Sequence, residues 1–522
     1  MTAVLRRVRH IVATARRRLL ALRIHRSVPF SHTVAIALLT VASMSVAVAY
    51  GGNDFYGDSL GFYSCARMLA AGRLSEPMRE LPGVDMHAYP PGLFTPPELV
   101  PLPRGAAHVW VLNRFVGWPL HMAIAAKAFG WVVGPILLLA LLTAGSVVLT
   151  YLLGISLGLS GPWALTAAAL VGLNPIVVLY SLVPMTDIAS MFWCVTAISA
   201  AVWSRKRAWL MLVSGVGLGI AVLVRPSNAV LLPSVLLFSP LRLKHLVWLV
   251  AGGLPVGIAR LSSNLIVFGN PFGNDLERTS NTFGWQYVNE GLAFYGHWFS
   301  WLFGPLLLTL GIAGTCWLAV RGKRSDLALW LWIASYLFLY AATRFAREGW
   351  WLLRYLMPAF PAFFIAAARA TDEARVALLR AGSHRILRHA AAVSLLGVWL
   401  WAFVAANNAW REWDIPATVS SQVPIAETVA WIEGKTPDRA VFAATQQMAS
   451  ALYFNTDAPC IHLDFEHNDP EQVRRLRDTL RHNRTPLYAI VWYREAPDLL
   501  ALEPRRWVYI GEHQQWFLFR DT

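Results

Sequence analysis

Long apolar stretches without charge alternate along the chain with short segments that carry most of the basic residues. Residues 131–154 (WVVGPILLLALLTAGSVVLTYLLG) hold no charge, and a helix of this length crosses the ~30 Å hydrocarbon core of a bilayer. Allowing for shorter and tilted helices, the criterion of ~20 apolar residues predicts about eleven spans. They lie near residues 30–50, 131–154, 160–180, 188–203, 208–224, 229–241, 246–268, 298–320, 327–342, 351–370 and 389–408.

The basic segments predict an orientation for these spans. Arginines crowd the first 26 residues, and further basic clusters lie at 205–207, 242–244, 321–324 and 375–388. With residues 1–29 as a basic cytoplasmic N-terminus, every cluster falls on the cytoplasmic side, as the positive-inside rule expects. The sequence therefore predicts a multi-pass protein of a bacterial inner membrane, with an uncleaved first span and an extracytoplasmic C-terminus.

Composition agrees with this picture. The chain is 56% hydrophobic and only 14% charged, about half the charged fraction of a typical soluble protein. Its net charge of +15 sits in the cytoplasmic segments, where anionic lipid headgroups are a sufficient partner. We therefore expect membrane lipids, and no nucleic acid, as partners.

Three regions follow from the spans. Residues 30–408 form the transmembrane domain, with residues 51–130 as a long first periplasmic loop, and residues 409–522 form a periplasmic domain. The last region alternates predicted helices (425–433, 445–453 and 470–482) with predicted strands (440–443, 460–463, 487–492, 507–511 and 516–520). Such alternation indicates an α/β fold with a mainly parallel sheet. No Gly-rich phosphate fingerprint follows a strand, so no nucleotide is assigned.

The first loop opens with the stretch NDFYGDSLGFYSCARMLAAGR, residues 53–73, directly after the first span. From Asp58, the positions of Phe62, Ala66 and Leu69 predict a helix lying along the membrane interface. The helix dipole at its N-terminus favours an ionised Asp58, which suits a general base that takes a proton from an attacking hydroxyl. Asp58 as a simple helix N-cap is the alternative. Asp54 lies one turn earlier.

This stretch resembles the first outer loop of the GT-C glycosyltransferases, in the branch of the protein O-mannosyltransferases, the lipid A aminoarabinose transferases and the bacterial RgtA/B/C/D-like enzymes. Their shared features here are an acid after the first span, an aromatic residue four positions on, and then Ala-Arg. Further segments resemble the same family in order and in membrane side. They are His87-Ala88-Tyr89-Pro90-Pro91, Asn174-Pro175, Pro184-Met185-Thr186-Asp187, Phe268-Gly269-Asn270-Pro271-Phe272 and Arg354-Tyr355-Leu356-Met357-Pro358-Ala359-Phe360-Pro361.

The resemblance implies a GT-C-like fold and a hexosyl- or pentosyltransferase. Such an enzyme takes a sugar from a polyprenyl-phosphate donor and places it on the hydroxyl of a lipid, glycan or protein acceptor outside the membrane. It also implies an inverting displacement in which Asp58 deprotonates the acceptor. Many members carry two adjacent acids, whereas Ser59 follows Asp58 here, which leaves Asp54 as the candidate partner. No His/Cys cluster has zinc spacing, so no metal site is predicted, although a divalent cation stays open.

The departing phosphate needs fixed cations, and arginine offers two parallel donors to a phosphate. Arg354 lies inside a predicted span, where an arginine is costly unless it is paired or functional. Snorkelling to the interface is its alternative reading. Arg344 and Arg347, in the outer loop just before this span, are further candidates. Arg260 lies inside a span and faces either a cavity or a partner acid.

Other candidates for substrate binding are His87, Tyr89 and Asp187. Asp187 is the only acid between Glu98 and Asp275, and it opens a predicted span on the outer side. It either holds a sugar or acceptor group or caps the helix. A loop histidine such as His87 is more often a surface or packing residue.

Two other functions remain open at this level. A transporter or flippase usually shows two similar halves with broken helices at matching positions, and this chain has no internal repeat. A non-catalytic subunit of envelope assembly would not need Asp58, Asp187 and Arg354 on one face. The sequence leaves the sugar and the acceptor undetermined.

Overall fold

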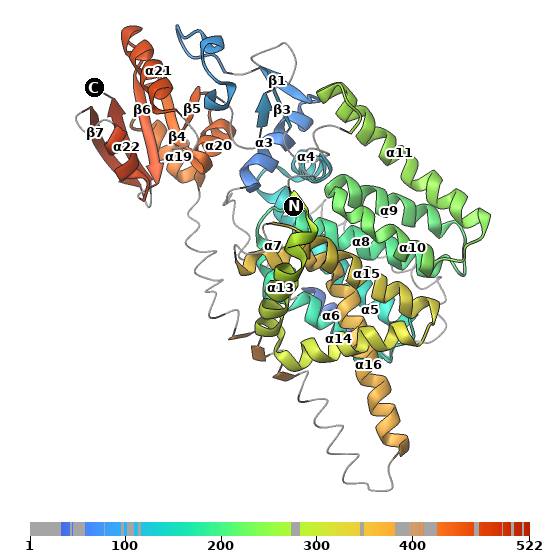
Figure 1. Cartoon of the computed structure of the whole chain (residues 1–522). Helices are drawn as coiled ribbons and strands as arrows, with labels where there is room; N and C mark the ends of the chain where they lie inside the picture. The colour runs from blue at the N-terminus through green and yellow to red at the C-terminus, as the bar shows by residue number, and fades with distance from the viewer. Residues whose placement is uncertain are drawn as a thin grey trace, which may run out of the picture.

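The computed structural model of the chain describes most of its length. The described residues are 33–41, 44, 58–77, 79–94, 99–101, 109–112, 116–272, 282–344, 349–381, single positions between 397 and 411, 425–463, 469–492, 494–502, 506–513 and 516–521. A helical domain holds the middle of the chain, and a small α/β domain holds its end (Figure 1).

The helical domain is built from apolar helices that the predicted spans anticipate in position. Residues 33–41 are helical. The later elements are α5 (Val133–Ser156), α6 (Gly161–Gly172), α7 (Pro175–Leu182), α8 (Thr186–Trp203), α9 (Leu210–Val224), η3 (Pro226–Leu231), α10 (Leu232–Phe238), α11 (Leu243–Phe268), η4 (Trp285–Tyr287), α13 (Val288–Phe303), α14 (Pro305–Val320), α15 (Arg324–Ala341), η5 (Trp350–Ala359) and α16 (Phe360–Ala381).

The predicted number of eleven spans is not confirmed. Among the described residues, four helices are long and apolar enough to cross a membrane, or six if each of two bent pairs counts as one span. The predicted span 298–320 is two helices, α13 and α14, set at 120°. Gly304 joins them with a φ of 78°, a left-handed conformation that glycine adopts without strain, and Pro305 then opens α14. The predicted spans 30–50 and 389–408 lie largely outside the described residues.

Two of the motif segments lie at the ends of helices. In the predicted span 160–180, α6 and α7 meet at 51° because Asn174 caps α7 and Pro175 is its first residue. The Asn174 side chain accepts a hydrogen bond from the backbone nitrogen of Ile176 at 2.9 Å. Gly269 ends α11 in the left-handed conformation (φ 66°), which explains the glycine of the Phe-Gly turn.

Burial separates a central helix from a peripheral one. The apolar window of α8 is 78% buried, whereas that of α11 is only 11% buried. Helix α9 lies between them and contacts both. Glycines permit the close approach of α9 and α11, because a Cβ on Gly215 would lie 2.1 Å from the carbonyl oxygen of Leu249.

The first loop is folded, with α3 at its start. Helix α3 (Asp58–Ala70) begins at the predicted residue, and it buries apolar side chains in two different cores. Phe62 and Ala66 join the core of the helical domain, whereas Cys65 and Met68 join that of the α/β domain. The rest of the loop holds β1 (Ser75–Pro77), η1 (Met86–Ala88), η2 (Pro91–Phe94), β2 (Leu99–Pro101), β3 (Val109–Leu112) and α4 (Gly117–Phe129). Strand β3 pairs with β1 and β2 in an antiparallel sheet.

The C-terminal domain follows the predicted alternation closely, with one correction. Its elements are α19 (Ile425–Glu433), β4 (Val441–Thr445), α20 (Gln446–Asn455), β5 (Cys460–Leu463), α21 (Pro470–His482), β6 (Leu487–Trp492), α22 (Ala496–Leu502), β7 (Trp507–His513) and β8 (Trp516–Asp521). The strand order is β5-β4-β6-β8-β7. Strands β5, β4 and β6 are parallel, but β8 is antiparallel to β6 and β7. The sheet is therefore mixed rather than mainly parallel, because β7 and β8 form a hairpin that needs no crossover.

The first loop and the C-terminal domain are docked against each other, and Arg79 makes the main polar contact. Its guanidinium donates to the carbonyl oxygens of Ala458 at 3.0 Å and Tyr453 at 2.8 Å, and it lies 4.3 Å from the Tyr453 ring centroid. Burial raises the pKa of the Tyr453 phenol, so the ring stays neutral and the contact is cation–π. Asn483 also donates to the carbonyl oxygen of Gly83 at 2.8 Å.

Arg79→Ala should destabilise this docking, because it leaves two half-buried carbonyl oxygens unsatisfied and removes the cation–π contact. The expected loss is about 1–3 kcal/mol of unfolding free energy. Thermal unfolding of the purified chain measures it. Arg73→Ala is the matched control, since Arg73 is exposed and should leave the transition unchanged. Equal transitions in both variants would show that the docking does not depend on Arg79.

Candidate functional site

A buried ion pair joins α8 to the end of α9. Asp187 lies in the first turn of α8 and is 0% exposed, and Arg225 directly follows α9. One guanidinium nitrogen of Arg225 lies 2.7 Å from Asp187 Oδ1, and its Nε donates to the Thr186 hydroxyl at 2.9 Å. Met185 occupies the N-cap position of α8, and the Asp187 carboxylate accepts a hydrogen bond from Arg225.

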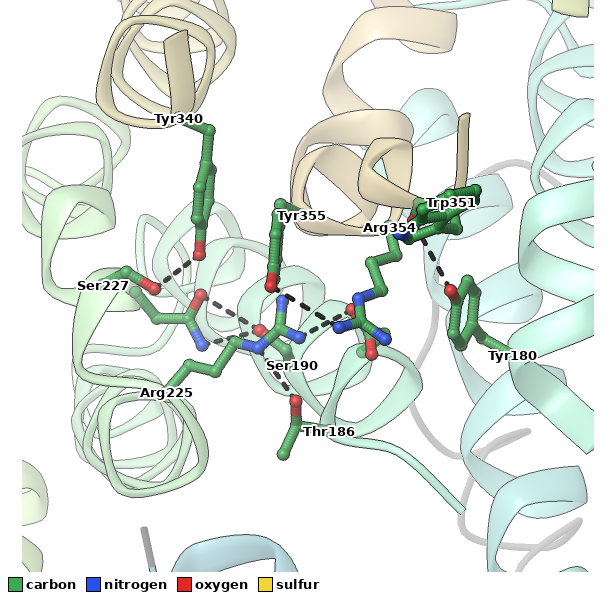
Figure 2. A network of polar contacts seen from close by, with 11 residues as sticks. Tyr180, Thr186, Ser190, Arg225, Ser227, Tyr340, Trp351, Arg354 and Tyr355 are labelled. Atoms are coloured by element: carbon green, nitrogen blue, oxygen red, sulfur yellow. Dashed lines mark hydrogen bonds and ion pairs between the residues drawn. The ribbon is translucent and has the colours of Figure 1, made fainter. Parts of the chain in front are cut away.

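A second arginine approaches from η5. Figure 2 shows Arg354 and Arg225 reaching toward the same place from different parts of the fold, with Tyr355 near both. The two guanidinium carbons lie 5.2 and 5.0 Å from the Tyr355 ring centroid. Arg354 also lies 5.6 Å from the ring centroid of Tyr180, whose hydroxyl donates to the Trp351 carbonyl oxygen at 3.4 Å. Aromatic faces of this kind stabilise guanidinium groups and hold their planes in place.

The site brings together two basic side chains and one acidic side chain. They are the guanidinium groups of Arg225 and Arg354 and the carboxylate of Asp187. Two buried polar atoms, Asp187 Oδ2 and Arg225 Nη1, have no hydrogen-bond partner within the part of the chain that the structure describes. Buried polar atoms usually have a partner. The arrangement therefore suits an anionic ligand that also carries hydroxyl donors.

A second layer of hydrogen bonds fixes the segment that carries Arg225. Asn228 donates to the Ser190 hydroxyl at 2.7 Å and accepts from the Tyr336 hydroxyl at 2.7 Å. The Ser227 and Tyr340 hydroxyls are 2.7 Å apart, and the Tyr340 ring stacks on Tyr355 with centroids at 5.0 Å. These bonds tie η3 to α8 and α15, which limits the freedom of the neighbouring guanidinium group.

Helix α4 of the first loop packs against the backbone that precedes each partner of the ion pair. The indole nitrogen of Trp118 donates to the Pro184 carbonyl oxygen at 2.9 Å, three residues before Asp187. A Cβ on Gly117 would lie 2.5 Å from the backbone of Leu223 and Val224, directly before Arg225. Helix α4 in turn packs on α3. The first loop is thus coupled to the site through a fully buried tryptophan.

The predicted site residues have different outcomes. Asp187 and Arg354 come together, joined by Arg225 and Tyr355. Asp58 is the first residue of α3, and its side chain lies outside the described part of the chain. Asp54, Arg347 and the side chain of His87 lie outside the described residues.

Two other predicted residues lie in contacts of their own. Tyr89 lies between the first loop and the C-terminal domain, where its hydroxyl is 3.3 Å from that of Thr479. Arg344 is exposed after α15, and its backbone nitrogen donates to the Thr282 carbonyl oxygen at 3.0 Å.

Arg225 is the main residue that sequence reasoning missed. It is the one basic residue between Arg207 and Arg242, and the predicted spans put it on the outer side. An isolated outer arginine departs from the positive-inside rule, and this was the available signal. Tyr180 and Tyr340 carried no comparable signal, because aromatic residues are common in apolar helices of this chain.

No protein-family model matches the chain, and no curated protein sequence matches it. Several solved structures, however, are similar to the chain. The ArnT structure from Cupriavidus metallidurans bound to undecaprenyl phosphate superposes with a TM-score of 0.56 at 14% identity, covering 95% of this chain and 98% of that one. The oligosaccharyltransferase AglB from Archaeoglobus fulgidus, in complex with an inhibitory peptide and a dolichol-phosphate, gives 0.53 at 13% identity over 94% of this chain and 74% of that one.

The mycobacterial arabinofuranosyltransferase AftD is also similar in structure. It gives a TM-score of 0.55 at 14% identity over 93% of this chain and 41% of that one. These similarities extend over nearly the whole chain. They confirm the resemblance at the level of the fold: the chain is a membrane protein with the GT-C glycosyltransferase fold.

Proposed function

We propose that this protein is a glycosyltransferase that moves a sugar from a polyprenyl-phosphate-linked donor to an acceptor hydroxyl at the extracytoplasmic face of the membrane. The single observation that carries the proposal is the buried site with two arginines and one aspartate. Arg225 and Arg354 converge beside Asp187, and Arg225 Nη1 has no hydrogen-bond partner among the described residues, so the site can bind an anion. A lipid-linked phosphate is the anion that reaches such a site from the bilayer.

The structural neighbours support the same chemical class. ArnT was solved with undecaprenyl phosphate, and AglB was solved with a dolichol-phosphate. Both are polyprenyl-type phosphates. The role proposed for Arg354 and Arg225 is to bind the phosphate of such a donor, with their planar forks offering paired donors to its oxygens.

The proposed reaction is a single displacement with inversion. A carboxylate of the first loop, Asp58 or its neighbour Asp54, accepts the proton of the acceptor hydroxyl. The acceptor oxygen then forms a bond to the anomeric carbon while the bond from that carbon to the phosphate oxygen breaks. The electron pair leaves with the phosphate, whose added charge Arg354 and Arg225 stabilise. Asp187 keeps Arg225 in place and offers its second oxygen to a sugar hydroxyl.

Asp58→Asn should abolish transfer while leaving thermal stability nearly unchanged. Asparagine is almost isosteric and tolerated at a helix N-terminus, but its amide cannot accept the proton. Loss of a general base typically lowers the rate by about 10²–10⁴-fold. The measurement is sugar transfer from a radiolabelled polyprenyl-phosphate donor in membranes, alongside thermal unfolding of the purified variant.

Asp54→Asn is the internal control on the same loop. If Asp54→Asn is inactive and Asp58→Asn is active, the base is Asp54 and the enzyme class stands. If both variants transfer sugar at the wild-type rate, the first loop does not supply the base and the proposed mechanism is wrong. A transporter or a non-catalytic subunit would show no sugar transfer even as the wild type.

Arg354→Lys should lower transfer by roughly 10–100-fold although the charge is kept. Lysine loses the paired donors and the planar contact with Tyr180 and Tyr355. Arg344→Lys is the matched control because Arg344 is exposed. Near wild-type transfer by Arg354→Lys, together with loss in Arg344→Lys or Arg347→Lys, would move the phosphate site to the loop before η5.

A further inference from the structure

A groove between α9 and α11 is separate from the site described above. It has a volume of about 340 Å³. Its lining is apolar apart from one arginine, and it consists of Gly215, Leu218, Gly219, Val222, Leu223, Leu232, Leu249, Val250, Gly253, Leu254, Val256, Gly257 and Arg260. The groove lies on the other face of α9 from the site, because Gly217 packs against Ala197 of α8 whereas Gly215 and Gly219 face α11.

The shape of the groove follows from its glycines. Helices α9 and α11 run in the same direction, since successive contacts join Gly215 to Leu249 and Gly219 to Val256. At Gly215 the backbones touch, because an added Cβ would lie 2.1 Å from the Leu249 carbonyl oxygen. At Gly257 an added Cβ would meet nothing within 4 Å. The two helices therefore close the groove at one end and diverge toward Arg260.

The groove opens to the surroundings of the helical domain. Leu254 on its wall is 55% exposed, and only 11% of the apolar window of α11 is buried. In a membrane, this face contacts lipid. Arg260 lies eight residues before the end of α11 at Phe268, which places it ~12 Å along the helix from that end. An arginine at this depth reaches toward the headgroup level with its long side chain.

The length of the groove indicates which kind of molecule fits it. Leu249 and Arg260 are 11 residues apart on α11, which is ~16 Å at 1.5 Å per residue. One leaflet of a ~30 Å hydrocarbon core is ~15 Å thick. The groove, which is closed at its Leu249 end, therefore matches the length of a single acyl chain in one leaflet. A polyprenyl chain longer than one leaflet would extend beyond the groove. A phosphodiester above that chain meets the paired donors of Arg260.

We propose that this groove is a binding site for an anionic phospholipid, with one acyl chain between α9 and α11 and the phosphate on Arg260. The site lies in the membrane half that also contains Arg225, since Leu223 on the groove wall is two residues from Arg225. A bound lipid fills the gap between the diverging helices and supports the end of α9 from the side opposite Asp187. This role does not require the chain to be a transferase.

Native mass spectrometry of the purified, delipidated chain titrated with phosphatidylglycerol tests the proposal. The wild type should retain a single tightly bound phosphatidylglycerol. Arg260→Gln should weaken retention by at least about tenfold through loss of the charge-assisted bonds. Gly257→Leu should do the same by filling the groove, since a Cβ at this position has no heavy atom within 4 Å and leaves room for a side chain. Arg73→Gln, at an exposed arginine of the first loop outside the groove and outside the basic clusters, is the control and should retain the lipid.

Two results would overturn the proposal. One is retention of phosphatidylglycerol by both Arg260→Gln and Gly257→Leu at the wild-type level. The other is displacement of phosphatidylglycerol by polyprenyl phosphate whose own binding is lost in Gly257→Leu, which would assign the groove to the donor lipid. Thermal unfolding of each delipidated variant is measured in parallel, so that loss of lipid is compared only between folded proteins.

Discussion

The ion pair between Asp187 and Arg225 is the interaction on which the site depends. Taking two charges into an apolar domain costs several kcal/mol per ion, and only close geometry with further hydrogen bonds offsets that cost. The pair has a distance of 2.7 Å and a bond to Thr186, and the Asn228 layer supports it. Yet each partner keeps one buried polar atom without a hydrogen bond among the described residues. Such a pair is stable enough to persist and still has bonds to offer a ligand.

The fold places this pair where three independent parts of the chain meet. Helix α8 supplies Asp187, the end of α9 supplies Arg225, and η5 supplies Arg354. Helix α4 of the first loop packs on the backbone beside both charged partners through Trp118 and Gly117. The first loop is in turn held by the C-terminal domain through Arg79. A change in the docking of that domain can therefore reach the ion pair through α3 and α4.

Much of the secondary structure could be predicted from local pattern. The elements 425–433, 460–463, 470–482 and 487–492 match the structure at both ends, because short strands and capped helices have strong local signals. The sheet direction could not be predicted, since a β-hairpin and a crossover leave similar strand patterns. The bend at Gly304 was also missed, because hydropathy averages over a break of one residue. Helix α22 and the sheet β1-β3-β2 were missed because their segments are short.

The site was predicted in part for a physical reason. Asp187 is the only acid between Glu98 and Asp275, and Arg225 is the only basic residue between Arg207 and Arg242. A lone acid and a lone base at the outer ends of neighbouring spans form a natural pair, because each is costly alone. Asp187 was predicted as a site residue, whereas Arg225 was not. The tyrosines around Arg354 depend on packing between distant helices, which no local pattern reports.

The central claim is that Arg225 and Arg354 together hold the phosphate of a lipid-linked sugar beside Asp187. A structure of the chain with a non-hydrolysable polyprenyl-phosphate sugar tests it most directly. The account predicts phosphate oxygens within hydrogen-bond distance of both guanidinium groups, and a sugar hydroxyl at Asp187 Oδ2. Phosphate bound at Arg344, Arg347 or Arg260, with the Asp187–Arg225 pair untouched by ligand, would contradict it.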